Sequence, residues 1–220
     1  MIITIDGPAG SGKSTAARKL AAKLGVAYLD TGAMYRATAY AALQRGVSLE
    51  DENALIDVAQ RCDIEVDCGP THTRVTLDGA DVTEAIRSMA VNHATGFVAR
   101  VPEIRRLLVE KQRAIGRELG SLVSEGRDQG SVVFPDAAVK FFLDAAIEKR
   151  AERRYQEMAA DGEEASYDQI IENLRRRDGN DQCQWAPLLE PKTAIYIDTT
   201  RMTIHEVVER LQEEVSRRSA

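Results

Sequence analysis

The fold is decided by the stretch Ile2-Ile3-Thr4-Ile5-Asp6-Gly7-Pro8-Ala9-Gly10-Ser11-Gly12-Lys13-Ser14 near the N-terminus. Residues 7–14 fit the phosphate-loop pattern G-x-x-x-x-G-K-[ST] without a mismatch. The apolar run before them predicts a β-strand, and residues 14–24 predict a helix that stops at Gly25. A strand, a glycine-rich loop and a helix in this order predict that the chain binds a nucleoside triphosphate. The alternative is a glycine-rich turn that matches the pattern by chance.

The chemistry expected of this loop follows from its residue types. Glycines let the backbone curl so that successive N–H groups face phosphate oxygens, and the N-terminus of the next helix adds positive partial charge. We expect the Lys13 ammonium to act in catalysis on the β- and γ-phosphates, and the Ser14 hydroxyl to ligate Mg²⁺. The predicted nucleotide-binding residues are Gly7, Pro8, Ala9, Gly10, Ser11, Gly12, Lys13, Ser14 and Thr15.

Composition excludes several classes of protein. The 220 residues are 44% hydrophobic and 29% charged, which is typical of a folded soluble protein and not of a disordered or collagen-like one. The length suits a single domain over residues 1–220. No apolar run approaches the roughly 20 residues that a membrane span needs. The net charge of −6 argues against general binding to nucleic acid.

The lack of a visible export signal and the cysteine usage both favour a cytoplasmic location for the protein. Residues 1–7 show no basic start and no cleavage site of an export signal. Cys62, Cys68 and Cys183 are odd in number and lack C-x-x-C spacing, which argues against disulfides and against a zinc site.

Five short apolar runs alternate with helical stretches, which predicts an α/β fold with a five-stranded parallel sheet flanked by helices. These runs are residues 2–5, 26–29, 122–124, 139–143 and 194–197. Capping boxes at Ser48 with Asp51, Ser166 with Gln169, and Thr203 with Glu206 predict the starts of further helices. The last helix is expected to pack on the sheet through Val207, Val208, Leu211 and Val215.

Two segments interrupt this alternation. Residues 63–83 are predicted to form a small antiparallel β insert with turns at Gly69-Pro70 and Asp78-Gly79. Residues 149–185 are predicted to be helical, charged and arginine-rich, with a loop at Asp161-Gly162. The motifs of GTPases, protein kinases and ATP-driven motors are missing from the sequence. A small α/β core with an insert and a late cationic segment is the layout of a small-molecule kinase.

Five motifs carry a family resemblance over nearly the whole chain. They are Ile5-Asp6-Gly7-Pro8, Leu29-Asp30-Thr31-Gly32-Ala33-Met34-Tyr35-Arg36, Leu77-Asp78-Gly79-x-Asp81-Val82-Thr83, Glu125-Gly126-Arg127-Asp128-x-Gly130 with Val133-Phe134-Pro135-Asp136-Ala137, and Arg177-Asp178-x-x-Asp181. Through them the sequence resembles the bacterial cytidylate kinases, a family of nucleoside monophosphate kinases whose hallmark is the antiparallel insert. The resemblance implies a P-loop NTPase fold and an enzyme that transfers the γ-phosphate of ATP to CMP or dCMP with Mg²⁺. It also implies a monophosphate-binding region over residues 31–118 and a lid over residues 149–185.

The resemblance assigns roles to residues on the acceptor side. Arg36, with Thr31 nearby, is expected to bind the α-phosphate of the acceptor, and Arg127 is expected to bind a phosphate as well. Asp128 is expected to accept a hydrogen bond from the amino group of cytosine, and Arg105 to contact the carbonyl edge of the base. A carboxylate suits this role because cytosine offers an N–H₂ donor where uracil offers an oxygen.

In the lid, the resemblance implies that Arg177 and either Arg153 or Arg154 touch phosphates or ribose. Arg153 is the lid arginine that we expect to be catalytic, and the other residues expected to be catalytic are Lys13, Arg36 and Arg127. Asp181 matches an aspartate that contacts the ribose. Each predicted arginine has a simpler alternative, which is an exposed side chain or a surface ion pair.

Two positions depart from the family pattern. Gln184 stands where the family usually has an arginine on the acceptor phosphate. Gly96 stands where it usually has a serine that helps to fix the base, and the adjacent Thr95 is predicted to bind substrate in its place. These departures bear on acceptor affinity and cytosine preference and leave the reaction class unchanged. Two other functions are considered: a kinase with a broader range of acceptors that includes UMP, and an ATP-bound regulatory module without catalysis. The protein is expected to be a monomer.

Overall fold

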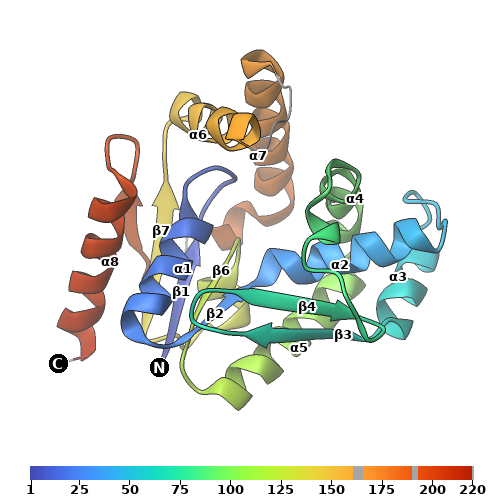
Figure 1. The fold of residues 1–220 in the computed structure, drawn as a ribbon, viewed down its shortest axis with the longest axis horizontal. Helices are drawn as coiled ribbons and strands as arrows, with labels where there is room; N and C mark the ends of the chain where they lie inside the picture. Colours follow the sequence, from blue (N-terminus) through green and yellow to red (C-terminus); the bar gives the residue numbers. More distant parts are fainter. Residues whose placement is uncertain (161–165, 190–192, 220) are drawn as a thin grey trace.

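A five-stranded parallel sheet forms the centre of the molecule (Figure 1). The computed structural model describes residues 1–160, 166–189 and 193–219, and for residues 182–189 and 219 it describes the backbone alone. The strand order is β2 (Ala27–Asp30), β6 (Leu122–Gly126), β1 (Ile2–Asp6), β7 (Val139–Asp144) and β8 (Ile195–Asp198). Each strand lies where an apolar run predicted it, so the predicted fold class is confirmed.

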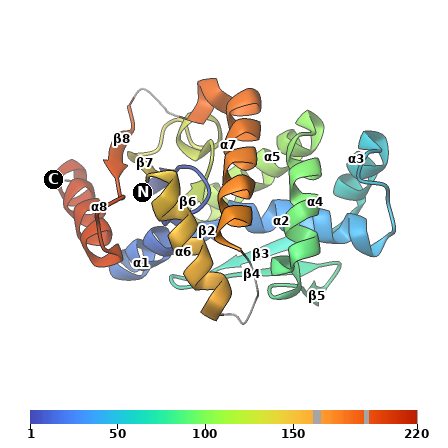
Figure 2. The same ribbon diagram turned by 90° about the horizontal axis from the view of Figure 1, so that it is seen from above.

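Helices cover both faces of this sheet (Figures 1 and 2). On one face lie α1 (Lys13–Leu24) and α8 (Ile204–Ser219), whose apolar side chains form a core with Ile3, Ile5 and Phe141. The predicted apolar face of α8 is buried at Val207, Val208, Leu211 and Val215. On the other face lies α5 (Pro102–Leu119), where Val109 packs with Leu29 and Leu122. Burial on both faces explains why the strands are continuously apolar.

The insert is antiparallel, as predicted, and its three strands are β3 (Ile64–Cys68), β4 (Thr73–Leu77) and β5 (Ala80–Asp81). The turn into β5 uses Asp78 and Gly79, which have φ values of 50° and 81°. The insert shares a second core with α2 (Thr31–Gln44), α3 (Glu52–Arg61), the 3₁₀ helix η1 (Ala85–Arg87) and α4 (Met89–Ala99). Together these elements form a layer to one side of the main sheet (Figure 1).

A helical hairpin of α6 (Ile147–Ala160) and α7 (Tyr167–Leu189) stands beyond the carboxyl ends of the strands (Figure 1). It has a small core of its own in which Ala151, Met158, Ile170 and Leu174 pack with Ala9 of the glycine-rich loop. The hairpin is therefore attached to that loop through apolar contact. The predicted loop at Asp161-Gly162 lies outside the described residues.

Two of the three predicted capping boxes are confirmed and one is wrong. Ser166 bonds reciprocally with Gln169, and Thr203 does so with Glu206. Ser48 does not begin a helix, because α3 starts after Asp51, whose carboxylate accepts from the backbone N–H of Ala54 at 3.0 Å. Asp caps a helix as well as Ser does, so the residue predicted as the acidic partner of the box is itself the cap. None of the described helices is long and apolar enough to cross a membrane.

Candidate active site

The loop between β1 and α1 has the backbone geometry of a phosphate cradle. A Cβ added to Gly7 would lie 2.0 Å from the carbonyl oxygen of Leu143, so a glycine is required there. Gly12, with a φ of 88°, is the N-cap residue of α1, and no side chain caps this helix. The first N–H groups of α1 therefore remain available to an anion.

Lys13 begins α1, and its side chain lies buried against this loop. Its Nζ is 3.4 Å from the Pro8 carbonyl oxygen and 3.9 Å from Oε2 of Glu125. Burial, followed by repulsion from Arg127, lowers the pKa of the Lys13 ammonium to about 8, although Glu125 acts in the opposite direction. Phosphate oxygens at the loop would favour the charged form of this lysine.

Glu125 is a buried site residue to which the sequence analysis gave no role. It lies on β6 directly opposite Ile5 of β1, and its Oε1 accepts a 2.8 Å hydrogen bond from the Ser14 hydroxyl. Burial raises the pKa of its carboxyl, and the Lys13 ammonium opposes this shift. Its sequence signal was a carboxylate near the end of an otherwise uncharged strand, just ahead of Arg127 and Asp128.

Arg36 is held in an ion pair at the start of α2. Its Nη2 lies 2.7 Å from Oδ2 of Asp30, whose other oxygen caps α2 through the N–H of Ala33. The Nε of Arg36 is buried and has no hydrogen-bond partner in the described part of the chain. Thr31, next to the cap, donates its hydroxyl to the Glu125 carbonyl oxygen at 2.7 Å. Arg36 thus keeps an unused donor, while the Thr31 hydroxyl is engaged by backbone.

Arg105 and Asp128 form a charged pair between α5 and the turn after β6, and both side chains are largely buried. The surface pairing considered for Arg105 is made instead by Arg106, which contacts Glu103 and Glu110. Tyr35 lies within range of both charges, and its pKa is raised above its usual value, mainly by burial. The pair offers one donor group and one acceptor group side by side, which suits a base that presents a carbonyl next to an amino group.

Thr95 and Gly96 are placed differently from the expected substitution. The Thr95 hydroxyl donates to the Val91 carbonyl oxygen of its own helix at 2.7 Å. Gly96 is exposed, and a Cβ built there meets open space. Thr95 is therefore turned to its own backbone, and the hydroxyl that Gly96 lacks is not visibly replaced.

Arg127 connects the main sheet to the helical hairpin. Its Nε donates to Oδ2 of Asp181 on α7 at 2.8 Å. Arg177 lies one turn before Asp181 on the same helix. Desolvation, followed by repulsion from Arg127, lowers the pKa of Arg177 to about 10, while Asp181 acts in the opposite direction. Cations from the turn after β6 and from α7 are thus brought close enough to repel each other, and anionic phosphates would relieve this repulsion.

The arginines of α6 lie at the glycine-rich loop. Arg150 is buried and donates to the Ala9 carbonyl oxygen at 3.0 Å and to both oxygens of Asp178 on α7. Arg153 donates to the Ser11 carbonyl oxygen at 3.1 Å and to Thr199. Arg154 pairs with the exposed Glu157. Of the two arginines predicted to be alternatives in the lid, Arg153 contacts the loop, and such a contact is not found for Arg154 among the described residues.

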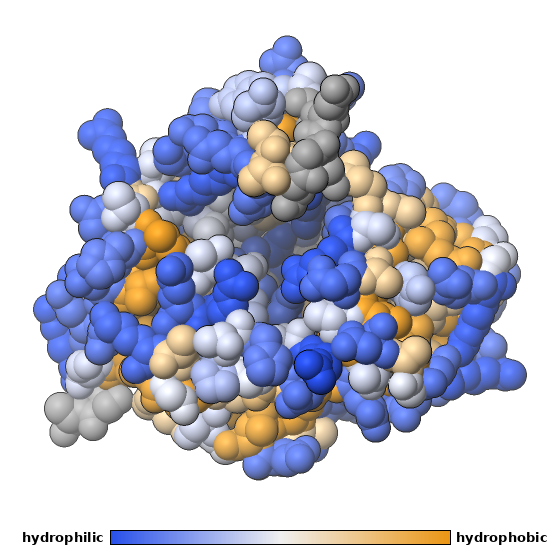
Figure 3. Space-filling view, in the orientation of Figure 1, coloured by the Kyte–Doolittle hydropathy of each residue, from blue (hydrophilic) through white to orange (hydrophobic). Residues whose placement is uncertain are grey.

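Figure 3 shows a hollow in the surface below the α6–α7 hairpin, with hydrophilic residues around it. Contacts link Lys13 and Ser14 to Glu125, Arg105 to Asp128, and Arg127 to Asp181. The described contact of the Thr95 hydroxyl is with the Val91 carbonyl oxygen and not with another predicted site residue. The side chain of Gln184 lies outside the described part of the structure.

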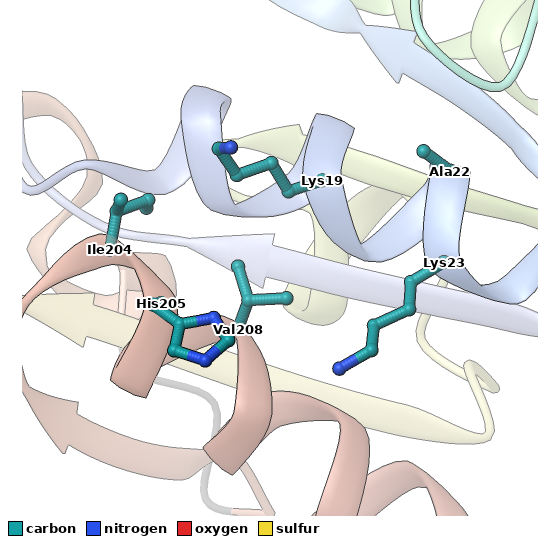
Figure 4. Close-up of a pocket in the computed structure, with 6 residues that line it drawn as sticks. All are labelled: Lys19, Ala22, Lys23, Ile204, His205 and Val208. Atoms are coloured by element: carbon teal, nitrogen blue, oxygen red, sulfur yellow. The ribbon is translucent and has the colours of Figure 1, made fainter.

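A second concavity, between α1 and α8, takes no part in this site (Figure 4). Its volume is about 460 Å³, and it is lined by Lys19, Ala22, Lys23, Ile204, His205 and Val208. Figure 4 shows the two lysines extending from α1 and His205 and Val208 facing them from α8. None of the predicted site residues lines it.

Comparison with known proteins agrees with this geometry. A family model described as cytidylate kinase matches residues 3–217. The cytidylate kinase of Caldanaerobacter subterraneus subsp. tengcongensis is 48% identical over 214 residues, which cover 97% of this chain and 93% of that protein. The cytidylate kinase of Bacillus subtilis is 43% identical over 218 residues, which cover 99% and 97%. A solved structure of an uncharacterized protein from Eubacterium ventriosum shares the fold, with a TM-score of 0.55 at 13% identity and 98% of both chains covered. From the family model and the two curated relatives, the chain belongs to the cytidylate kinase family.

Proposed function

We propose that this chain transfers the γ-phosphate of ATP to CMP or dCMP, which gives CDP or dCDP and ADP. One observation carries the proposal: the glycine-rich loop follows β1, and Asp128, which pairs with Arg105 of α5, follows the neighbouring strand β6 at the same end of the sheet. Asp6, which precedes the loop, lies opposite Gly126, which precedes Arg127 and Asp128. Open α/β sheets bind ligands at the carboxyl ends of their strands, so donor and acceptor meet across this edge.

On the donor side, residues 7–15 bind the triphosphate of ATP. The N–H groups at the start of α1 point to its oxygens, and Lys13 neutralises charge on the β- and γ-phosphates. Phosphoryl transfer needs positioned phosphates and fixed positive charge more than covalent help from the protein. A buried lysine with a pKa of about 8 gains most from an anionic ligand.

The donor set at Ser14 fits Mg²⁺. The Ser14 hydroxyl and the Glu125 carboxylate lie 2.8 Å apart, and both are hard oxygen ligands. The described residues contain no cluster of three or more His, Cys, Asp or Glu side chains suited to a metal. Mg²⁺ does not require one, because it takes most of its ligands from phosphates and water. When bound, the ion would neutralise charge that develops on the phosphate oxygens.

On the acceptor side, Arg36 and Arg127 bind the phosphate of CMP, with Arg177 approaching from α7. Asp128 accepts from the amino group of cytosine, and Arg105 donates to its carbonyl edge. Because both side chains are largely buried, a base that cannot satisfy them leaves a desolvated charge without its partner. Asp181 is proposed to contact the ribose, and Thr31 and Thr95 to border this subsite.

Residues 149–185, which make up most of the α6–α7 hairpin, act as a lid. The lid lies above a monophosphate-binding region that consists of residues 31–118. Arg153 is the proposed catalytic arginine of the lid, since it is in contact with the loop carbonyl of Ser11. A lid excludes water from the γ-phosphate, and without this exclusion a kinase would hydrolyse ATP.

We further propose that the enzyme works as a monomer in the cytoplasm, without nucleic acid or membrane partners. The proposed donor and acceptor groups all come from one chain, so a second copy is not needed to complete the site. The net charge of −6 disfavours binding to nucleic acid.

The proposal is tested by a coupled assay of ADP release with ATP, Mg²⁺ and each nucleoside monophosphate in turn. We expect turnover with CMP and dCMP to exceed turnover with UMP, AMP and GMP. Equal rates with CMP and UMP would contradict the assigned base preference. ADP release without any acceptor dependence would contradict the kinase assignment.

A further inference from the structure

Asp6 is a buried carboxylate at the end of β1 to which neither the donor site nor the acceptor site assigns a role. Its side chain is 0% exposed. Its Oδ1 accepts the backbone N–H of Gln129 and its Oδ2 accepts that of Gly130, both at 2.8 Å. Both carboxylate oxygens are thus used on two successive backbone donors of one turn.

That turn is the π-helical segment η2 (Gln129–Val133), and it begins directly after Arg127 and Asp128. The Asp128 backbone leaves the strand at φ −142° and ψ 24°, and its carbonyl oxygen accepts from Val132 at 2.8 Å. The orientation of the Asp128 side chain therefore depends on how the start of η2 is held.

The side chain of Gln129 fixes the same turn from its other side. Its Oε1 accepts from the Ser124 hydroxyl at 2.8 Å. Its Nε2 donates to Oε1 of Gln112 at 3.2 Å and to the Thr31 hydroxyl at 3.4 Å. Through this side chain the turn is connected to β6, α5 and the start of α2, which are the elements that carry the proposed acceptor residues.

We propose that Asp6 is a positioning residue. It holds the adjacent residues Arg127 and Asp128, which are proposed to bind the acceptor, in a fixed position relative to the phosphate loop. The inference rests on the proposed function. Asp6 immediately precedes Gly7, so one residue both ends the strand that leads to the donor loop and holds the turn that presents the acceptor residues. Hydrogen bonds to a charged acceptor are stronger than neutral ones, and a buried network in which all donors are matched specifies one geometry.

Burial raises the pKa of Asp6 to about 7, although the bonds from Gly130 and Gln129 oppose this shift. A buried carboxylate is costly for a protein to keep. The free-energy cost of this buried carboxylate is offset because its two oxygens accept the N–H groups of both Gln129 and Gly130.

Asp6→Asn is the decisive variant, because the amide has the same shape but only one acceptor oxygen. Its NH₂ group would face one of the two backbone donors, so η2 must shift. We expect the KM for CMP to rise about tenfold or more and the CMP/UMP ratio of kcat/KM to fall. A small displacement of substrate-positioning side chains has a large effect on activity. The KM for ATP should change less than about threefold. The phosphate loop keeps its separate anchors, which are the contact of Gly7 with Leu143 and the bonds from Arg150 and Arg153.

The control is Thr4→Val, two residues earlier on the same strand. Thr4 is 0% exposed, and its hydroxyl has no hydrogen-bond partner among the described residues. This variant should leave both KM values unchanged. A purely structural role of Asp6 would lower the amount of folded enzyme, and hence the apparent kcat, without separating the two KM values.

An unchanged KM for CMP in folded Asp6→Asn protein overturns the inference, and so does a parallel rise of both KM values. If Asp6→Asn does not fold, Gln129→Met, which loosens the same turn from the other side, takes its place with the same criteria. Native protein that fails to phosphorylate CMP overturns the proposed function itself. Native protein that phosphorylates CMP while Asp6→Asn is unaltered overturns this inference alone.

Discussion

The donor half and the acceptor half of the cleft hold their charged groups in different ways. The donor loop is shaped by backbone, and its lysine lies 3.9 Å from the nearest carboxylate oxygen. On the acceptor side the arginines are closely paired: Arg36 lies 2.7 Å from Asp30 and Arg127 lies 2.8 Å from Asp181. Under the proposed function, ATP binds where no described side chain caps the first N–H groups of α1, whereas CMP has to replace ion pairs that already exist.

This difference teaches that the two sites bind by different physics. A preorganised cradle contributes to catalysis because it needs no rearrangement when charge develops. Ion pairs that are partly buried must lose one partner before they can bind a new one, which costs free energy. We therefore expect changes on the donor side to affect the chemical step and changes on the acceptor side to affect selectivity.

The largest effect is expected from Lys13→Ala, which would break the donor half. Loss of one preorganised charge in a water-poor site lowers kcat about 10²–10³-fold. The measurement is ADP release with saturating ATP and CMP, with thermal unfolding as a check of folding. Lys19→Ala, an exposed lysine on the same helix, serves as the matched control and should keep native turnover. Near-native turnover of Lys13→Ala would mean that the loop is not catalytic.

The second effect concerns the acceptor half and the choice of base. Asp128→Asn supplies an amide that can donate to the oxygen of uracil, so it should lower kcat/KM for CMP about 10²-fold and narrow the gap to UMP. Asp136→Asn, an exposed aspartate farther along the same loop, is the control. If the CMP/UMP ratio stays unchanged in Asp128→Asn, the base is read by other residues.

Asp6, at the end of β1, should make the stability of the protein depend on pH. The pKa of Asp6 is about 7 in the folded protein against an ordinary 3.8, so between these values the native state binds a proton that the unfolded state does not. The resulting stabilisation is complete below pH 3.8 and is lost as the pH rises through 7. Raising the pH from 5 to 8 should lower the unfolding free energy of native protein by about 2 kcal/mol relative to Asp6→Asn. Denaturant titrations at both pH values measure this, and a constant difference would contradict it.

Ligands should protect the lid more when both halves are filled. We expect hydrogen exchange in residues 149–185 to slow about tenfold with ATP plus CMP, because closure over both phosphates buries backbone there. ATP alone should give less protection, since the pairs on the acceptor side remain in place. Peptides of α8, on the far face of the sheet, are the internal control. Unchanged exchange under both ligands would exclude the lid assignment.

The smallest effect is expected at Gly96, where a side chain would meet open space. By the family resemblance, Gly96→Ser restores a hydroxyl that helps to fix the base, so the CMP/UMP ratio should rise about two- to fivefold, as for one modest hydrogen bond. Gly96→Ala is the control, because it also raises the helix propensity at this position but adds no hydroxyl. Equal ratios in the two variants would show that the position does not read the base.

The fold and the donor loop could be predicted because their signals are local. Apolar runs marked all five strands of the main sheet, and the pattern from Gly7 to Ser14 marked the loop. The error at Ser48 arose because serine and aspartate cap helices equally well, so two candidates three residues apart, Ser48 and Asp51, could not be ranked. The structure pairs Arg105 with Asp128, a contact that the sequence analysis did not predict, and the roles of both residues toward the base stay predictions.

Glu125, Asp6 and Arg150 could not be identified in the same way. Each receives its role from partners far away in the sequence: Ser14 for Glu125, Gln129 and Gly130 for Asp6, and Ala9 for Arg150. Strand pairing and the placement of α6 bring these groups together, and neither spacing nor periodicity encodes which distant backbone group a side chain will meet.

The central place of β1 has a consequence for how the chain is made. Ile2 pairs with Leu122 and Ile3 pairs with Val139, so β1 leaves the ribosome long before either of its neighbours in the sheet. At about 5–20 residues per second, β1 and its glycine-rich loop wait about 6 to 24 s for β6 alone. During that time an apolar strand with both edges open is exposed to aggregation, and contacts of such long sequence separation also slow folding itself. The strand β1 is thus synthesised well before it can be assembled into the sheet, and a chain interrupted before β6 would carry the phosphate-loop sequence without the sheet that shapes it.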